Sequence, residues 1–460
     1  MWCGMSETPQ SVTGKQVFKG VTCPFCGVVC DDLEVHVEDG KIKEVKNACV
    51  LGRDTYLHHL QGLTTPRLHG KPAEIDACID AAVEILAAAK YPLIYGLDST
   101  EMHAQKRAVE LADLLGANID HTSSVCHAPS LQAVQTVGLP SCTVGEVKNR
   151  ADLVIFWGCN PAEAHPRHPT RYSVTARGMF TPQGAKDRTV IHVDVRKNPS
   201  TRMADAFIQI RPHSDYEIFS VLTALVNGHD LDIEEVGGVP MEEWRRLVQL
   251  MKEAEYGIVH WGMGLTMTRG KYMNIVALLR LCQELNRFTH FLAAPLRGHG
   301  NVVGMAQVLT WQTGFPFAVN LSRGYPRFNP GEFSVADLLA RGEIDAALII
   351  GADAIGNFPG KAADHLRTVP LVAIDPKESD TTRIADVVIP VAQAGVATDG
   401  VAYRMDHVPL PQTKVVDSPW PPDRDVLDRI IAGVKSKRGE VETRPWTFEG
   451  RSGRIPPPAG

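Results

Sequence analysis

Four cysteines near the N-terminus have the spacing of a metal-binding motif. Cys23, Cys26, Cys30 and Cys49 form the pattern C-x2-C-x3-C-x18-C. Thiolates this close in sequence reach a common centre when the backbone wraps around it, and a [4Fe-4S] cluster takes four such ligands. Four thiolates are also the ligand set of a structural zinc site, so the pattern alone leaves zinc open as the alternative.

A fifth cysteine stands in the run Thr122–Pro129, where Cys126 is followed directly by His127. Free cysteines are among the most buried residue types, and a neighbouring histidine is often only a satisfied polar group. A functional role becomes the stronger interpretation once the other motifs of the chain are considered with it. We therefore take Cys126 as a candidate metal ligand.

Two segments of the chain repeat one nucleotide-binding pattern. A strand-like run ending in glycine is followed by a strand-like run ending in aspartate, first at Gly158 and Asp194 and again at Gly351 and Asp375. The glycine lets the backbone approach a phosphate, and the carboxylate accepts from ribose or guanine. One such unit is a weak signal, but Thr-Arg-x-Ala-Asp follows both aspartates at the same offset. The repeat predicts one pseudo-symmetric dinucleotide or two nucleotide-tailed cofactors.

Two glycine-rich loops lie between the repeated units. One contains Gly262 and Gly264, and the other is the loop 297–301, Arg-Gly-His-Gly-Asn. Glycines permit close approach of the backbone to a ligand, and Arg297 could hold a planar carboxylate through two hydrogen bonds. An exposed loop without a ligand is the alternative for the second one. The residues assigned to cofactor binding are Gly158, Asn160, Asp194, Arg196, Arg202, Gly262, Gly264, Gly351, Asp375 and Arg383.

The elements around these motifs indicate a layered α/β architecture. Residues 33–45 form two alternating runs joined by Asp-Gly, which predicts a hairpin that brings Cys49 back beside the other three cysteines. From about residue 65, helical and apolar strand-like segments alternate, as in parallel-sheet folds. Such folds bind ligands in loops at the carboxyl ends of strands, where Cys126 is expected to lie. Residues 1–20 are expected to be unstructured, and the segment after about residue 438 to be a tail.

Composition excludes several classes of function. The chain has 460 residues and a net charge of -6, which argues against nucleic-acid binding. It shows no apolar window of the roughly 18 residues that a membrane span needs, and residues 1–15 lack a secretion signal. Ten cysteines are too few for a disulfide scaffold in a chain of this length. We expect a cytoplasmic protein with neither nucleic acid nor membrane as a partner.

The order of these motifs resembles the molybdopterin and tungstopterin oxidoreductases over nearly the whole chain. The matching features are the four-cysteine motif, Cys126, Gly-x-Asn-Pro, Asp-x-Arg, the Arg297 loop and the second Gly/Asp unit. More specifically, the runs 143–153, 164–168 and 311–316 resemble the catalytic-subunit family of formylmethanofuran dehydrogenases. Some cluster-bearing relatives carry a lysine just after the fourth cysteine, whereas Val50 and Leu51 stand here and Arg53 is only a loose substitute.

The resemblance implies a multidomain α/β fold with two related parallel-sheet nucleotide-binding domains and a small iron-sulfur domain. We expect an iron-sulfur domain at 1–65, one α/β domain at 66–140 plus 285–410, a second at 141–284, and a C-terminal segment at 411–460. It also implies two pyranopterin guanosine dinucleotides around one W or Mo. The C-terminal β-barrel domain of longer relatives is missing, which implies a separate β-barrel subunit as a partner.

The same resemblance implies reversible reduction of CO2 to formate. Cys126 would bind the metal as a thiolate, Arg297 would hold the carboxylate, and His127 would donate a hydrogen bond or shuttle a proton. Amidohydrolase-like and formyltransferase-like partner subunits would pass the formate to methanofuran. The alternative is a non-redox scaffold subunit of the bacterial formyltransferase/hydrolase complex, but a scaffold has no need for five placed thiolates. A formate dehydrogenase acting alone is disfavoured by the missing barrel.

Overall fold

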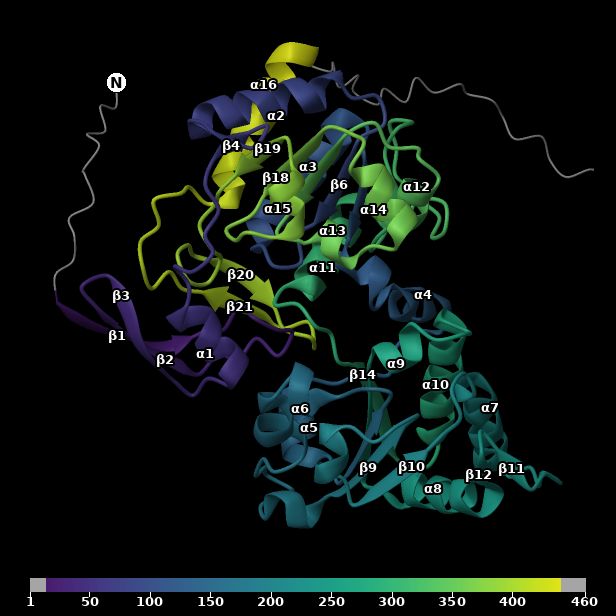
Figure 1. Cartoon of the computed structure of the whole chain (residues 1–460). Coiled ribbons are helices and arrows are strands. Elements are labelled where there is room, and N and C mark those ends of the chain that lie inside the picture. The colour runs from purple at the N-terminus through teal and green to yellow at the C-terminus, as the bar shows by residue number, and fades with distance from the viewer. Residues whose placement is uncertain (1–13, 440–460) are drawn as a thin grey trace, which may run out of the picture.

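The computed structural model of the chain describes residues 14–439 (Figure 1). A small antiparallel sheet at the N-terminal end has the order β1-β2-β3. Its elements, with the helix that follows, are β1 (Lys15–Val21), β2 (Leu33–Glu38), β3 (Lys41–Lys46) and α1 (Val50–Leu57). The predicted hairpin is confirmed, with Asp39 and Gly40 at positive φ in its turn.

The expectation that residues 1–20 are unstructured is wrong for β1. This polar strand pairs with β2 along its whole length, from Lys15 opposite Glu38 to Val21 opposite Leu33. Its own sequence lacks an apolar alternation, so its order comes from the neighbouring strand and not from local pattern. Residues 1–13, which the same expectation covered, and the expected tail at 440–460 lie outside the described residues.

The larger of the two main sheets has the order β16-β15-β7-β6-β17-β18-β19-β4-β5. The five strands from β7 to β19 run parallel, and the edge strands on both sides pair antiparallel. In sheet order the strands are β16 (Arg327–Phe328), β15 (Val319–Asn320), β7 (Asn118–His121), β6 (Leu93–Gly96), β17 (Ala347–Ile350), β18 (Leu371–Ile374), β19 (Val387–Ile389), β4 (Arg67–Leu68) and β5 (Lys71–Pro72).

Helices cover both faces of this sheet, because successive strand residues alternate between two apolar cores. Ile94 and Ile350 belong to one core, and Leu93 and Ile349 to the other. The helices of the first face are α2 (Ile75–Ala88), α3 (Met102–Leu115), α11 (Val302–Thr313) and α16 (Asp423–Arg438), and those of the second are α12 (Val335–Ala340) and α14 (Gly360–Leu366). Although the sequence placed α16 in a separate segment at 411–460, its apolar side chains complete the first core.

The smaller main sheet is wholly parallel, with the order β10-β9-β8-β13-β14. Its strands are β10 (Ala206–Gln209), β9 (Thr189–Asp194), β8 (Leu153–Trp157), β13 (Tyr256–Trp261) and β14 (His290–Pro295). One face packs against α4 (Ala128–Val137), α7 (Asp215–Val226), α8 (Met241–Glu253) and α10 (Tyr272–Leu285). The other face shares a core with α5 (Val144–Arg150) and with the N-terminal sheet. The sheet thus includes β14, which lies beyond the limit expected for this domain at residue 284. It also packs on α4, which precedes the limit expected at residue 141.

Short helices and two small hairpins complete the described chain. The short helical turns are η1 (Thr122–Val125), α6 (Pro161–Ala164), η2 (Pro169–Ser173), η3 (Gly184–Asp187), η4 (Pro199–Met203), α9 (Met263–Thr266), α13 (Ala354–Asn357) and α15 (Asp380–Ile384). The hairpins are β11 (Glu235–Val236) with β12 (Val239–Pro240) and β20 (Gly400–Tyr403) with β21 (Pro409–Gln412). No helix among residues 14–439 is long and apolar enough to cross a membrane.

The two main sheets contain the same three-strand parallel unit. Strands β8, β9 and β10 lie side by side in chain order, and so do β17, β18 and β19. Two more parallel strands adjoin each unit, β13 and β14 in one sheet and β6 and β7 in the other, but β13 and β14 follow their unit along the chain whereas β6 and β7 precede theirs. Gly158 and Gly351 both adopt positive φ, at 56° and 58°. Their amides donate to Val193 and Ile374 of the neighbouring strands at 2.9 Å in both cases. The internal repeat inferred from the sequence is therefore a structural repeat.

Candidate functional site

The four N-terminal cysteines line one small hollow between the N-terminal sheet and the Arg167 segment. Cys49 caps helix α1, where its sulfur accepts the Gly52 amide at 3.4 Å. A Cβ added at Gly52 would stand 3.0 Å from Cys23 Sγ and 3.8 Å from Cys49 Sγ, so this glycine leaves room for both sulfurs. The hairpin thus brings Cys49 to the other three cysteines, as the spacing predicts.

Burial makes free thiolates costly in this hollow. It raises the pKa of the Cys23 thiol well above its ordinary value and the pKa of Cys26 to about 12. Burial also raises the pKa of Cys30, against the opposing effect of Arg167 and Arg171. A cationic metal centre would remove this cost by holding all four groups as thiolates.

The hollow is compatible with a [4Fe-4S] cluster, whose cube is held by four thiolates around it. Among residues 14–439, no three or more His, Cys, Asp or Glu side chains are grouped closely enough to hold a single metal ion. The cluster therefore stays a prediction, with a zinc site of four thiolates as the alternative.

Replacing Cys26 with Ala is expected to lower the iron content by about four atoms per chain, since a cube needs all four thiolates. Elemental analysis of the purified variant and the wild type measures the difference. Cys78, a fully buried cysteine of α2, provides the control, because Cys78→Ala removes a thiol elsewhere and should leave iron unchanged. Equal iron in Cys26→Ala and the wild type would contradict the cluster. Zinc instead of iron in the wild type would favour the zinc site.

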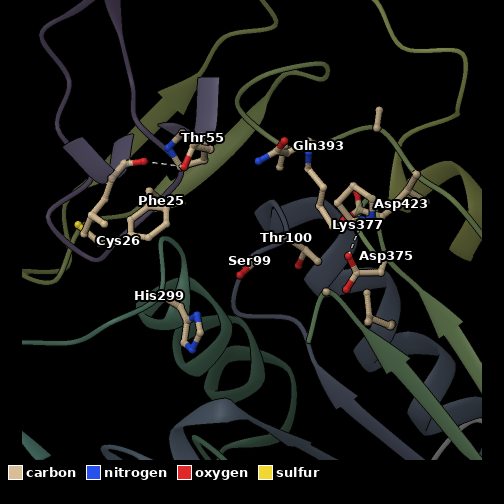
Figure 2. Close-up of a pocket in the computed structure, with 18 of the residues that line it drawn as sticks. Phe25, Cys26, Thr55, Ser99, Thr100, His299, Asp375, Lys377, Gln393 and Asp423 are labelled. Atoms are coloured by element: carbon tan, nitrogen blue, oxygen red, sulfur yellow. Dashed lines mark hydrogen bonds between the residues drawn. The ribbon is translucent and has the colours of Figure 1, made fainter. Parts of the chain in front are cut away.

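A cavity of about 830 Å³ brings the second nucleotide unit, the cluster loop and the Arg297 loop together. Figure 2 shows Phe25 and Cys26 on one side, His299 from the loop 297–301, and Asp375 with Lys377 across the space. The lining residues that belong to predicted motifs are Cys26, Gly298, His299, Gly351 and Asp375. The second Gly/Asp unit therefore opens onto a ligand-sized space.

Asp375 is one of the ionisable groups that line this cavity. Burial raises the pKa of its carboxyl to about 7, and the amide of Lys377 donates to Oδ1 at 2.8 Å. The Lys377 ammonium turns away to donate to the carbonyls of His58, His59 and Gln61. Oε1 of Gln393, another lining residue, is buried with no hydrogen-bond partner. An unpaired acceptor and an uncompensated carboxyl fit a ligand that supplies N–H donors, such as a guanine.

The first nucleotide unit has the same local hydrogen bonds as the second. Asn160 Oδ1 accepts the Ser200 hydroxyl at 2.7 Å, and Asp353 Oδ1 accepts the Thr381 hydroxyl at 2.8 Å. Asp194 accepts from Asn198 at 3.0 Å. These hydrogen bonds order the loops that follow β8 and β17, where the repeat predicts nucleotide binding.

The remaining predicted residues of the two units differ in their surroundings. Gly262 and Gly264 pack against the turn at Gly158, where added Cβ atoms would come within 2.8 and 2.7 Å of its carbonyl oxygen. Backbone packing alone therefore requires both glycines. Three predicted arginines are exposed, namely Arg196, Arg202 and Arg383. The cofactor role of these residues stays a prediction.

Cys126, His127 and Arg297 come together although their loops are far apart in sequence. Arg297 is 2 % exposed, and burial lowers its pKa to about 10 while Cys126 opposes the shift. Burial raises the pKa of Cys126 to about 12, with Arg297 acting in the opposite direction. Burial and the Arg297 charge lower the pKa of His127 to about 3, so the imidazole is neutral. A thiol, a neutral imidazole and a guanidinium thus share one buried environment.

The main chain of Cys126 is fixed by the smaller sheet. Thr266 of α9 donates its hydroxyl to the Cys126 carbonyl at 2.7 Å, and Trp261 Nε1 donates to Ser130 Oγ at 2.9 Å. Ser130 Oγ also lies 3.3 Å from His127 Nδ1. The Cys126 loop follows β7 of the larger sheet, so the residues are held between the two sheets.

Sequence reasoning missed two residues of this environment. Asp98 is 1 % exposed and contributes charge at both Cys126 and Arg297. It accepts from Thr122 and pairs with His121 Nδ1 at 2.9 Å. Its place just after β6, at the carboxyl end of a parallel strand, is the signal that could have identified it. His165, which contacts the Arg297 carbonyl, carried no such signal by itself.

Comparison with known proteins identifies a matching family model, related sequences and a related structure. The model of the molybdopterin oxidoreductase family matches residues 78–421. The chain is 48% identical over 430 residues to the B subunit of tungsten-containing formylmethanofuran dehydrogenase 2 of Methanocaldococcus jannaschii, covering 91% of this chain and 99% of that protein. It is 26% identical to the B subunit of the formyltransferase/hydrolase complex Fhc of Methylorubrum extorquens, covering 73% and 87%. Among solved structures, acetylene hydratase from Pelobacter acetylenicus shares the fold, with a TM-score of 0.70, 15% identity and coverage of 92% and 70%.

Proposed function

The chain belongs to the molybdopterin oxidoreductase family, and from this premise we propose that it is the catalytic subunit of a formylmethanofuran dehydrogenase. It would reduce CO2 reversibly to formate at one W or Mo held by two pyranopterin guanosine dinucleotides. The observation that carries the proposal is the shared buried environment of Cys126, His127 and Arg297. The 48% identical relative, which is named as tungsten-containing, supports the choice of reaction.

The residues of this environment suit carboxylate chemistry. When bound, the pterin-held metal would supply the two-electron redox change. Cys126 would be its protein ligand, since a bound metal overcomes the raised pKa of the buried thiol. The Arg297 guanidinium has Nε and Nη1 without partners and would hold a carboxylate by its charge and its free N–H groups. His127 is neutral and would donate a hydrogen bond or take up a proton transiently.

The rest of the chain would deliver electrons and hold the cofactor. The cluster of Cys23, Cys26, Cys30 and Cys49 would pass electrons one at a time, and its loop reaches the large cavity through Cys26. Gly351 and Asp375 would bind the guanosine end of one dinucleotide, and the equivalent loop at Gly158 and Asp194 that of the other. The nine free cysteines of the described residues suit a reducing compartment, and we place the protein in the cytoplasm.

The proposal includes partner subunits. A β-barrel subunit would complete the pterin site, and amidohydrolase-like and formyltransferase-like subunits would transfer formate to methanofuran. The names of the formylmethanofuran dehydrogenase and formyltransferase/hydrolase relatives designate lettered subunits of larger assemblies, which supports a complex here.

The pKa of Asp375 gives the nucleotide site a predicted pH dependence. The ionised carboxylate accepts guanine N–H groups, and protonation below about pH 7 weakens this interaction. We expect the affinity for GDP to fall as the pH drops from 8 to 6, by up to about tenfold per unit below the pKa. Calorimetry on chain prepared without pterin measures it. Asp375→Asn should bind GDP with a clearly smaller pH dependence; some remains because burial also raises the pKa of Asp423, in the same cavity, to about 7. An unchanged pH profile in this variant would contradict the assignment.

Metal content tests the proposal as a whole. The purified complex should contain about one W or Mo per copy of this chain, since one metal is shared by two pterins. Elemental analysis determines this content. A complex with neither W nor Mo would contradict the redox proposal and favour the scaffold role that the 26% identical relative raises.

A further inference from the structure

The Arg297 guanidinium lacks the contacts that normally orient a buried arginine. The side chain is 2 % exposed, and its Nε and Nη1 atoms have no hydrogen-bond partner. Packing and the position of its main chain then set the direction of the side chain. The contacts that hold the Arg297 main chain therefore help to decide where the guanidinium points.

One of these contacts comes from His165, which is 3 % exposed. Its Nε2 lies 2.7 Å from the carbonyl oxygen of Arg297. A carbonyl only accepts, so Nε2 carries the proton and donates, and Nδ1 is the unprotonated nitrogen without a partner. Burial lowers the pKa of His165, which keeps the ring neutral, and the hydrogen bond to the carbonyl fixes this tautomer.

His165 belongs to the loop that follows strand β8 of the first nucleotide unit. His165 ends the short helix α6, which follows directly on Asn160 in the loop after β8. The hydrogen bond therefore joins the first nucleotide loop to the Arg297 loop, 132 residues away in sequence. A second contact comes from the cluster loop, where the Gly27 amide donates to the Gly298 carbonyl at 2.9 Å. A Cβ at Gly27 would lie 2.3 Å from the Arg297 oxygen, so the peptide is confined on both sides.

We infer that His165 is a positioning residue that sets the direction of the Arg297 guanidinium from the first nucleotide loop. The inference rests on the proposed function, in which Arg297 binds the substrate carboxylate. Without the hydrogen bond, the Arg297 carbonyl loses the donor that ties it to the loop after β8, although the preceding Leu296 amide still donates to the Trp261 carbonyl at 2.8 Å. The guanidinium then samples directions that do not match a carboxylate, and substrate binding weakens before the chemical step does.

Two variants of His165 separate donation from bulk. His165→Leu removes the donor, whereas His165→Gln keeps an N–H donor at a similar reach. His168→Leu is the matched control, because His168 is equally buried, comes from the next turn of chain and contacts Ser173 rather than Arg297. All three are prepared as the complete complex and compared by formate oxidation with an artificial electron acceptor and by W or Mo content.

We expect His165→Leu to lower kcat/KM for formate by about 10- to 100-fold, mostly through a higher KM, because small misplacements of binding groups cost that much. His165→Gln should stay within about threefold of the wild type, since it keeps the donor. His168→Leu should keep the wild-type KM whatever its melting temperature. Metal content should be equal in all four proteins.

Calorimetric titration with azide, a three-atom anion, gives a second measurement that needs no turnover. The Kd for azide should rise in His165→Leu and stay near the wild-type value in His165→Gln. Equal KM and azide Kd in these two variants would overturn the inference, as would a His168→Leu variant as impaired as His165→Leu. A wild-type complex that binds azide but does not oxidise formate would instead overturn the proposed function, and the azide comparison would still decide the role of His165.

Discussion

Replacing Cys126 with Ser is expected to abolish CO2 reduction while leaving the fold intact. The change removes the proposed thiolate ligand of the metal, because a serine hydroxyl is far less acidic than a thiol and offers a different donor atom. Stability should change by less than about 1 kcal/mol, because the substitution is nearly isosteric at a partly exposed position. Reduction of CO2 with a low-potential electron donor, together with the melting temperature, provides the measurement.

Cys142 supplies the control for this variant. It is also a partly exposed free cysteine, and it lies outside the Cys126, His127 and Arg297 environment. Cys142→Ser should therefore keep wild-type activity. Full CO2-reducing activity in Cys126→Ser would refute the redox role of this residue. Loss of complex assembly alone would favour the scaffold alternative.

Replacing Arg297 with Met should lower kcat/KM for formate by about 10²- to 10³-fold, the usual cost of removing one placed charge-stabilising group. The same variant should be as stable as the wild type or more stable. Burial lowers the pKa of Arg297 to about 10, and two of its nitrogens lack partners, so the folded protein bears a desolvated charge that Asp98 compensates only in part. Residues placed for function often carry such a cost in stability.

Arg188 provides a matched comparison, because it is a buried arginine whose guanidinium is hydrogen-bonded. It is also buried, but its guanidinium donates to the Ala151 carbonyl at 3.0 Å and to the Thr181 hydroxyl at 2.7 Å. Arg188→Met should therefore lower the melting temperature and keep kcat/KM per folded enzyme. Retained formate turnover in Arg297→Met would contradict the carboxylate role, and so would equal losses of turnover in both variants.

The parts of the fold that the sequence predicts correctly are those with a local pattern. The hairpin carries its own Asp-Gly turn, and the repeat shows itself because Gly158 and Gly351 need the same positive φ. The strand β1 was missed because its order comes from pairing with β2. Helix α16 was missed as part of a core because its partners, α2 and α3, lie more than three hundred residues earlier.

The candidate site shows the same division. Cys126 and Arg297 stand in short motifs whose residue types suggest chemistry, so they could be named in advance. Asp98 and His165 act through contacts that only the folded chain creates, the first beside Cys126 and the second on the Arg297 carbonyl. Neither carries a spacing rule that would separate it from the other buried polar residues of the chain.

Conversion of ¹³C-labelled CO2 to labelled formate by the purified complex is the decisive measurement for the proposed reaction. With a low-potential electron donor, we expect labelled formate from the wild type and none from Cys126→Ser prepared in the same way. A complex that contains W or Mo and accepts electrons, yet forms no labelled formate, would contradict the proposed reaction.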